Sequence, residues 1–339
     1  MSGNHRDSLS ATVFLIILFM LIGTGAAFGE GAASVAGSGG AIWGADYFPD
    51  VPLVTHEGKK VRFFSDLIKN KVVAINFIYT NCPDACSLET ARLREVQKIL
   101  GERVGRDVFI YSITIDPAYD TPEVLKRYAE KFQIGPGWLF LTGKEADITL
   151  LRKKFGLYNE EGRSEKLQEH NLSNIIGNQA TGQWMKSSPY ENPYVLATQL
   201  GSWLHNWKMP PGARKDYSDA PQIRNISKGE ELFRARCSAC HTIGAEDAAG
   251  TKVRPIGPDL LNVTRKRDRT WLIRWMKEPD IMLAEKDPLA ITLLAEYNGV
   301  PMPNLKLNST DIQDLFEYIE EESHRAEHHR HGEHEHHHH

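Results

Sequence analysis

The sequence predicts an α/β domain followed by a smaller all-α domain. Apolar runs of strand length at 71–80, 107–116 and 138–143 alternate with segments of helical periodicity, which is typical of a sheet covered by helices on both faces. Beyond residue 225 the apolar residues follow helical spacing, and the segment 207–224 is a proline-containing linker without a periodic pattern. A length of 339 residues is enough for two hydrophobic cores.

Residues 1–29 have the order of a secretory signal: polar residues, then an apolar run without charges, then small residues. The apolar run is at the short end for a membrane span, which needs about 20 residues, so an uncleaved membrane anchor is the alternative. Residues 30–44 form a spacer rich in Gly, Ala and Ser. In either case we expect the rest of the chain to be exported, to the periplasm or to the outer face of the inner membrane.

The charge and the cysteines narrow the class of protein. Lys plus Arg is 40 and Asp plus Glu is 44, so no basic excess exists to bind a phosphate backbone, and nucleic acid is not an expected partner. The four cysteines form two close pairs, Cys82 with Cys86 and Cys237 with Cys240, and none is left to join distant segments. We therefore interpret them as site cysteines rather than as a disulfide scaffold.

The first domain, 45–206, carries the first cysteine pair where its buried strand 71–80 ends. The next segment is a predicted helix that ends at Gly101. Its apolar residues have helical spacing: Leu93, Val96, Ile99 and Leu100.

A second helix of this domain is expected to have Asp120 as its N-cap, Pro122 in its first turn and Phe132 at its end. The remaining expected elements are a helix over 146–156, a hairpin over 173–188 that turns near Gly177 and Gly182, and a helix over 192–204.

The second domain, 225–322, is expected to be all-α, with helices joined by loops and no strands. Ser227 and Glu230 form a capping box that opens a helix leading into the second cysteine pair. Further helices are expected over 270–279 and from about Ser309. The last of these has an apolar face: Ile312, Leu315, Phe316 and Ile319.

Cys237, Cys240 and His241 form the pattern Cys-X-X-Cys-His, which is the attachment signal for c-type haem. On a helix, thiols three residues apart lie on one face and can form thioethers to both haem vinyl groups, while the adjacent imidazole points at the iron. Zinc would need two further Cys or His ligands at suitable spacing, and a redox disulfide is the other alternative.

Met302 is the expected sixth ligand of the iron, because it lies in a proline-flanked loop and because methionine with histidine is the usual ligation for electron transfer. Met276 and Met282 are interpreted as core residues. The whole segment resembles a class I cytochrome c in three stretches: "CSACH", "IGPDL" (256–260) and "MPNL" (302–305). The resemblance implies haem c as a cofactor, a Pro258 loop beside the proximal histidine, and electron transfer rather than substrate chemistry.

Three residues separate Cys82 from Cys86, one more than in a thioredoxin-type redox pair. At i and i+4 they would share a helical face near an N-terminus, where the helix dipole favours thiolate. Two thiolates in a shallow surface loop suit Cu(I), and an imidazole would complete a trigonal site. His170 is the candidate, His56 and His205 are weaker candidates, and a disulfide is the alternative use of the cysteines.

Residues 45 to about 205 resemble the Sco/SenC family, thioredoxin-fold copper proteins of bacterial envelopes and mitochondria. Three stretches carry the resemblance: "FIYTNCPDACSLE", "ITIDPAYDTPEVLKRYAEKF" and "GPGWLFLTG". It implies a thioredoxin-like fold and copper held by Cys82, Cys86 and His170. Asp116 and Asp120 also match family positions. The chain departs from the family pattern at Ser87, where many members have proline, and around His170.

Residues 323–339 form a His-rich, acidic tail of a kind that binds Cu(II), Ni(II) or Zn(II) promiscuously. Because Glu, Arg and Gly interrupt its histidines, we favour a native metal-gathering segment over an expression tag.

These features predict an envelope copper chaperone that assists assembly of the dinuclear copper centre of cytochrome c oxidase and carries a haem domain for electron transfer. The expected partners are the copper-binding subunit of the oxidase and other envelope redox proteins. The alternative is a thiol-disulfide reductase in which Cys82 and Cys86 reduce cysteines of the oxidase subunit while the haem exchanges electrons. A third hypothesis is an electron carrier whose Sco-like domain only docks it to an oxidase.

Overall fold

The computed structural model describes the backbone of residues 46–82, 86–158, 173–205, 225–244 and 256–335, and side chains up to residue 328. The predicted signal or anchor, the spacer, the linker 207–224 and His170 lie outside the described residues. In the part of the chain that is described, no helix combines the length and the apolar composition that a membrane crossing requires.

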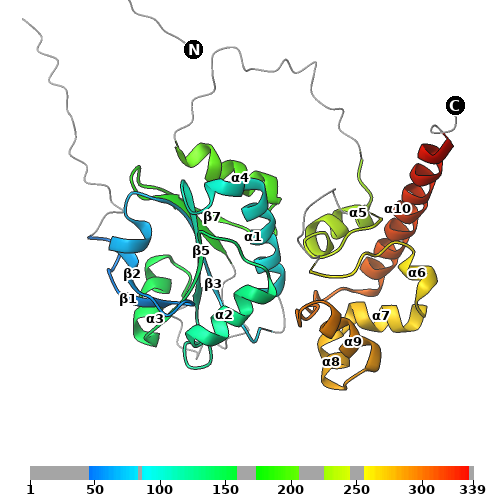
Figure 1. Ribbon diagram of the computed structural model, residues 1–339, viewed down its shortest axis with the longest axis horizontal. Coiled ribbons are helices and arrows are strands. Elements are labelled where there is room, and N and C mark those ends of the chain that lie inside the picture. The colour runs from blue at the N-terminus through cyan, green and yellow to red at the C-terminus, as the bar shows by residue number, and fades with distance from the viewer. Residues whose placement is uncertain (1–45, 83–85, 159–172, 206–224, 245–255, 336–339) are drawn as a thin grey trace, which may run out of the picture. The chain divides into compact units, whose positions relative to one another are not determined.

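The α/β part is built on one seven-stranded sheet with the strand order β2-β1-β5-β4-β3-β6-β7 (Figure 1). Its strands are β1 (Pro52–Thr55), β2 (Lys60–Arg62), β3 (Val72–Ile78), β4 (Val108–Thr114), β5 (Trp138–Gly143), β6 (Asn174–Asn178) and β7 (Gln183–Ser187). The three central strands β3, β4 and β5 run parallel, and the other pairings are antiparallel.

Helices cover both faces of this sheet, as the sequence predicts (Figure 1). The helices are α1 (Cys86–Leu100), α2 (Pro122–Lys131), α3 (Glu145–Lys154) and α4 (Pro193–Gly201), with shorter helical turns η1 (Phe63–Ile68), η2 (Gly101–Arg103) and η4 (Trp203–His205). The connections β3-α1-β4 and β4-α2-β5 step along the sheet in one direction, so right-handed crossovers place α1 and α2 on one face. Helix α4 packs against α1, and α3 lies on the opposite face.

The central strands are buried because helices lie on both sides of them. Every residue of β3 is buried, which explains why its sequence is continuously apolar around Asn76 instead of alternating. The hairpin β1–β2 was not predicted. Its strands have four and three residues, and only Leu53 and Val61 among their apolar side chains are deeply buried.

Three local predictions for this part are wrong in detail. Helix α1 buries Leu93, Val96 and Leu100, but Ile99 is 40% exposed because it lies off the stripe of the other three. The N-cap of α2 is Thr121, whose Oγ1 accepts from Val124 N at 3.4 Å, and Asp120 is fully buried instead. In the β6–β7 hairpin, Gly182 lies in the turn, whereas Gly177 lies within β6.

Gly177 has a packing role in that strand rather than a turning role. A Cβ atom at this position would lie 2.3 Å from the Trp184 ring of the paired strand β7. The glycine therefore makes room for the indole, which also contacts Phe48 and Phe155 on that face of the sheet.

The second part of the chain is all-α in its described residues. Its helices are α5 (Lys228–Leu232), the wide turn η6 (Phe233–Cys237), α6 (Val263–Lys266), α7 (Arg269–Lys277), α8 (Pro279–Ala284), α9 (Pro288–Glu296) and α10 (Ser309–Glu335). The predicted N-cap at Ser227 is confirmed, because Ser227 Oγ accepts from Glu230 N at 3.1 Å, while the Glu230 carboxylate lies 2.6 Å from Arg234 Nη2.

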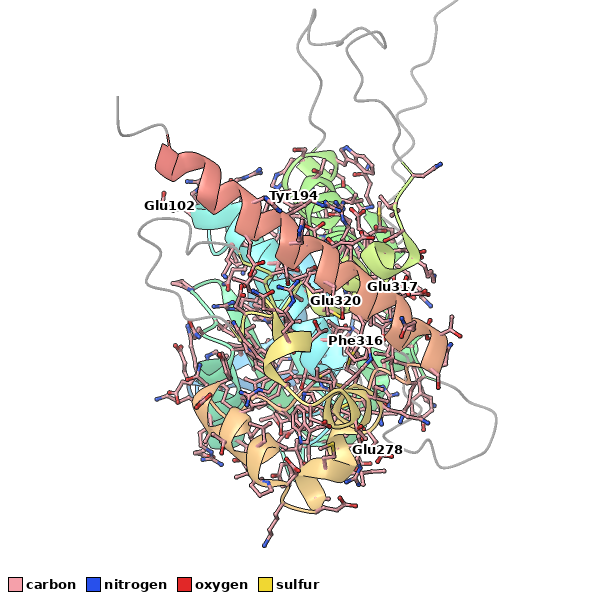
Figure 2. The ribbon with its side chains drawn as sticks, turned by 90° about the vertical axis from the view of Figure 1, so that its right-hand side faces the viewer. Glu102, Tyr194, Glu278, Phe316, Glu317 and Glu320 are labelled. Carbon is pink, nitrogen blue, oxygen red and sulfur yellow. The ribbon has the colours of Figure 1, made fainter. Side chains whose placement is uncertain are left out.

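Helix α10 supplies one wall of the helical core. The predicted apolar face is confirmed: Ile312, Leu315, Phe316 and Ile319 are all less than 5% exposed and pack with Leu232, Phe233 and Leu272. Phe316 lies on this buried face, while Glu317 and Glu320 are exposed on the same helix (Figure 2). Gly229 permits the close crossing of α5 and α10, because a Cβ there would lie 2.0 Å from the carbonyl oxygen of Asp314.

Replacing Gly229 by alanine is expected to separate α5 from α10, since the backbone of Asp314 cannot move aside as a flexible side chain would. Overpacking of this kind costs about 1–3 kcal/mol. Denaturant unfolding of the haem-loaded chain, followed through the haem absorbance, measures the loss. Lys228→Ala, an exposed change in the same helix, is the control and should stay within about 0.5 kcal/mol. Equal stability of Gly229→Ala and the control would contradict this account of the crossing.

Candidate functional sites

The first cysteine pair lies at the junction between β3 and α1. Cys82 follows the end of β3, and Cys86 is the first residue of α1. Neither cysteine forms a disulfide, and their exposed fractions are only 8% and 1%. The expectation of a shallow surface loop is therefore wrong, because the helices and strands around this junction enclose both sulfurs. Only Cys86 belongs to the helix, so the two cysteines do not share a helical face.

The electrostatics of this pair also differ from the prediction. Its hydrogen bond with the Cys82 thiol, together with burial, raises the pKa of Cys86 above its usual range. The helix dipole was expected to favour thiolate at this position. Burial and the neighbouring sulfur outweigh it, so Cys86 is a neutral thiol at neutral pH in the metal-free chain.

Asp120 fixes the segment that leads into Cys82. Its carboxylate accepts hydrogen bonds from the Thr80 backbone N at 3.1 Å, from Thr80 Oγ1, and from Thr114 Oγ1 at 2.5 Å. Thr80 and Thr114 stand at the carboxyl ends of β3 and β4, so one buried side chain joins the two strand ends. Burial raises the pKa of Asp120, and the threonine hydrogen bonds oppose that rise.

Two further side chains hold the first turn of α1. Thr90 Oγ1 donates to the Cys86 carbonyl at 2.8 Å, and the Tyr128 hydroxyl of α2 lies 3.0 Å from Thr90 Oγ1. Tyr128 is buried, so this hydrogen bond is shielded from water. The position of Cys86 is therefore determined by α2 as well as by its own helix.

Glu89 is a buried acid beside the thiol pair that the sequence analysis missed. It is 1% exposed, and neither carboxyl oxygen accepts a hydrogen bond from a described residue. The Asn76 amide lies nearby without normal hydrogen-bond geometry, since its nitrogen has no partner either among these residues. Burial raises the pKa of Glu89 to about 8, and the Cys82 sulfur adds to the rise. Its position three residues after Cys86, on the same side of a helix, was the available sequence signal.

The predicted third copper ligand, His170, lies outside the described residues, and within those residues no cluster of three His, Cys, Asp or Glu is suited to a metal ion. The two weaker candidates have other surroundings. His56 Nδ1 lies 3.2 Å from the Phe140 backbone N, which donates to it, and His205 ends η4. The ligand set of Cys82, Cys86 and His170 stays a prediction.

The second cysteine pair lies where η6 ends. The backbone N of Cys240 and of His241 each donate to the Cys237 carbonyl at 3.0 Å, which closes a tight turn around the motif. The His241 Nδ1 lies 2.8 Å from the Pro258 carbonyl and donates its proton to it, which leaves Nε2 available as a ligand. Burial lowers the pKa of His241, so its imidazole is neutral at neutral pH.

Two adjoining hollows meet at this motif. They share six lining residues: Cys237, His241, Pro258, Trp275, Leu293 and Met302. The second hollow encloses about 980 Å³, its open mouth included, with walls that are mainly apolar. Such a space suits a large flat cofactor with one edge toward the solvent.

Met302 lines both hollows, whereas Met276 lines one of them and Met282 is a fully buried core residue. The loop that carries Met302 is held to α8 by the Asn304 Nδ2, which donates to Asp280 Oδ1 at 2.8 Å. Met302 therefore shares both hollows with His241, and its role as an iron ligand stays a prediction.

The residues present fit c-type haem. Burial raises the pKa of both Cys237 and Cys240 to about 12, so these sulfurs are thiols before attachment. Gly257 is a further residue that the sequence analysis missed. A Cβ at this position would lie 2.7 Å from His241 Cε1, so only glycine leaves the imidazole its place. Its neighbour Pro258 was the only local signal.

Two family models match the chain. The SCO1/SenC model matches residues 44–203, and the cytochrome c model matches residues 226–323. The matches cover the α/β part and the helical part in turn.

Individual proteins are also similar to the first of these segments. A SCO2-like protein from Rickettsia felis is 31% identical over 153 residues, which are 42% of this chain and 71% of that protein. The structure of Bradyrhizobium japonicum ScoI with copper bound is 25% identical, with a TM-score of 0.37, over 44% of this chain and 94% of that one. The structure of BsSco is 26% identical, with a TM-score of 0.38, over 44% of this chain and 89% of that one.

Replacing Gly257 by alanine is expected to push the His241 imidazole away from the Pro258 carbonyl. The crowding should cost about 1–3 kcal/mol of stability and alter the visible absorption spectrum of the haem-loaded chain. Ile256→Val is the control, because it removes one methyl group beside the same loop without crowding the imidazole. A Gly257→Ala spectrum identical to that of the control would show that the glycine is not required.

Replacing Glu89 by glutamine is expected to change how the stability of the metal-free, reduced chain depends on pH. The pKa of Glu89 rises from 4.5 to about 8 on folding, so between these values the folded state holds a proton that the unfolded state has lost. Stability should therefore fall as pH rises through this window, by about 1.4 kcal/mol per pH unit. Glu89→Gln should remove this fall in denaturant unfolding experiments between pH 5 and 8; equal slopes in the two proteins would contradict it.

The relative from Rickettsia felis is matched over more than two thirds of its length, and the two thiols lie at the strand-to-helix junction of a sheet with the topology described above. The helical part has a Cys-X-X-Cys-His segment whose imidazole is oriented toward an apolar hollow, and the cytochrome c model matches it. The chain belongs to the SCO1/SenC family, and its Sco domain is followed by a cytochrome c domain.

Proposed function

We propose that this protein is a copper chaperone of the cell envelope that assists assembly of the dinuclear copper centre of cytochrome c oxidase. The observation that carries the proposal is the pair of buried, mutually hydrogen-bonded thiols of Cys82 and Cys86. Copper is the cargo, held by these two sulfurs and by His170. We place the protein in the periplasm or at the outer face of the inner membrane, on the signal-like sequence of residues 1–29.

The chemistry of the donor set supports copper in its reduced state. Thiolate sulfur is a soft ligand that prefers Cu(I), and three ligands suit this ion. Because Cys86 is protonated in the empty site, uptake of the cation requires its thiol to release a proton. That proton goes to the solvent, because the neighbouring Glu89 carboxyl, with its pKa raised to about 8, is itself mostly protonated at neutral pH.

The cytochrome c domain supports a redox role beside this site. When bound, haem c supplies one-electron transfer. Cys237 and Cys240 would hold it covalently, His241 and Met302 would bind its iron, and the apolar lining of the hollows would limit access of water. Such a domain suits control of the oxidation state of copper or of the cysteines.

The expected partner is the copper-binding subunit of the oxidase, with other envelope redox proteins as further partners. BsSco is described as a member of the Sco family of cytochrome c oxidase assembly proteins, and the Bradyrhizobium japonicum relative was solved with copper bound. Family membership supports the same task for this chain.

The proposal is tested by the copper content of the haem-loaded, reduced chain, with the histidines from His324 onward replaced by glutamine. One copper per chain is expected, and it should be lost in Cys82→Ser and in His170→Ala, because each removes one of three ligands. His205→Ala is the matched control and should retain copper. Retention in His170→Ala would refute the ligand assignment, and no copper above background in the parent protein would refute copper chaperoning.

A thiol-disulfide reductase is the second candidate, favoured by the direct contact between the two thiols. In this reaction Cys82 and Cys86 form a disulfide while a partner's disulfide becomes two thiols, with transfer of two electrons and two protons. The two functions differ in their need for His170. The reductase would be favoured if two results were found together. The His170→Ala variant would reduce a disulfide in the oxidase subunit at the wild-type rate, and the wild-type chain would bind no copper.

A further inference from the structure

The end of helix α10 carries two histidines one turn apart. His324 and His328 occupy i and i+4 on its exposed side, and their ring centroids are 4.3 Å apart. Their Nε2 atoms face one another at 3.2 Å. Two exposed imidazoles have many rotamers that would separate them, so this convergence of nitrogen atoms is the feature to be explained.

The backbone that carries these histidines is held in place. Ser323 is 2% exposed, and its Oγ accepts from the Asn262 backbone N at 3.0 Å. Glu327 accepts from Asn262 Nδ2 and lies 3.5 Å from Arg265. Each histidine is therefore directly preceded by a residue, Ser323 or Glu327, that bonds Asn262 at the start of α6. These contacts hold this turn of the helix against fraying.

The separation of the two nitrogens matches that of a chelate. A metal ion bound to two imidazole nitrogens at about 2.0–2.1 Å, with angles between tetrahedral and square-planar values, holds them about 2.8–3.4 Å apart. The observed 3.2 Å falls within this range. In the metal-free chain the same approach allows one ring to donate its Nε2 proton to the lone pair of the other ring.

The charge around the pair is slightly negative, because three arginines, Arg265, Arg269 and Arg325, pair with four carboxylates. Four carboxylates lie in the same stretch of helix: Glu320, Glu321, Glu322 and Glu327. The one cation between the histidines, Arg325, is paired with Glu321 and Glu322. None of these carboxylates forms a third ligand among the described side chains, which leaves solvent to complete the coordination.

We propose that His324 and His328 form a two-imidazole chelate for a divalent ion of a late first-row transition metal. Imidazole nitrogen suits Cu(II), Ni(II) and Zn(II), with Cu(II) bound most strongly of the three. The site is separate from the Cys82 and Cys86 pair, which suits Cu(I). It does not depend on copper chaperoning, because it rests on the geometry of α10 alone.

The site also lies at the beginning of the His-rich tail, on a part of α10 that is fixed in position. Seven of the chain's 14 histidines follow His328. The pair lies where the helix is still fixed to the cytochrome c domain, so an ion caught there has a fixed position relative to that domain. Binding would also clamp one turn of α10 and stabilise the helix against unfolding.

The test uses the full haem-loaded chain with Cys82→Ser and Cys86→Ser, which remove the thiol site, and with asparagine at the seven histidines beyond His328. Ni(II) is the probe, measured by equilibrium dialysis with elemental analysis. One tight Ni(II) per chain is expected. His324→Ala and His328→Ala should each weaken binding on the order of 100-fold, because two linked ligands act as a bivalent site.

A second readout separates the chelate from a structural effect. Ni(II) should raise the unfolding midpoint of the parent chain and leave those of His324→Ala and His328→Ala unchanged. His205→Ala is the matched control, which should bind Ni(II) like the parent. Absence of tight Ni(II) in the parent, or its retention after loss of either histidine, would overturn the proposal. Because the thiol pair is absent from every variant, failure here says nothing against the copper site.

Discussion

The pairing of β3 with β4 is the constraint on which the α/β part depends. The two strands run parallel in register from Val72 opposite Val108 to Ile78 opposite Thr114, so their carboxyl ends reach the same edge of the sheet. That shared edge lets the buried carboxylate of Asp120 join Thr80 to Thr114. Hydrogen bonds to a charged group are worth about 1.5–3 kcal/mol each. The segment before Cys82 is thereby held in place before any metal arrives.

Burial of this junction determines how its groups are charged. Cys86 and Glu89 both lose their hydration, and each has the Cys82 sulfur beside it, so both have raised pKa values and prefer to be neutral. A cation that entered the junction would reverse this preference, since its own charge compensates the thiolates. Under the proposed function, an empty site therefore holds protons on Cys86 and Glu89, and occupancy is coupled to release of the Cys86 proton. The same burial limits access of water to the sulfurs.

In the cytochrome c domain a single helix serves both stability and chemistry. The face of α10 around Phe316 closes the core against α5, with Gly229 at the crossing. Its last turns leave the core but stay attached through Ser323, and there the two histidines converge. The haem motif is ordered by different means, since the Pro258 carbonyl orients His241. Oriented imidazoles therefore occur twice in this domain, once in an apolar hollow and once in solvent.

Neighbouring residues in the chain were enough to predict β3, β4 and β5, the N-cap at Ser227 and the buried face of α10, because periodicity and caps are local. They were not enough for the short hairpin β1–β2, which is stabilised by its pairing with β5. The capping role expected of Asp120 was wrong because its carboxyl group bonds Thr114 at the end of β4 and Thr80 just after β3 instead. Residue type and spacing were enough to identify the two cysteine pairs and the haem motif. The burial of Cys86, its neutral state and the position of Glu89 beside the cysteines follow only from the fold, because burial and pKa depend on segments that are distant in the chain.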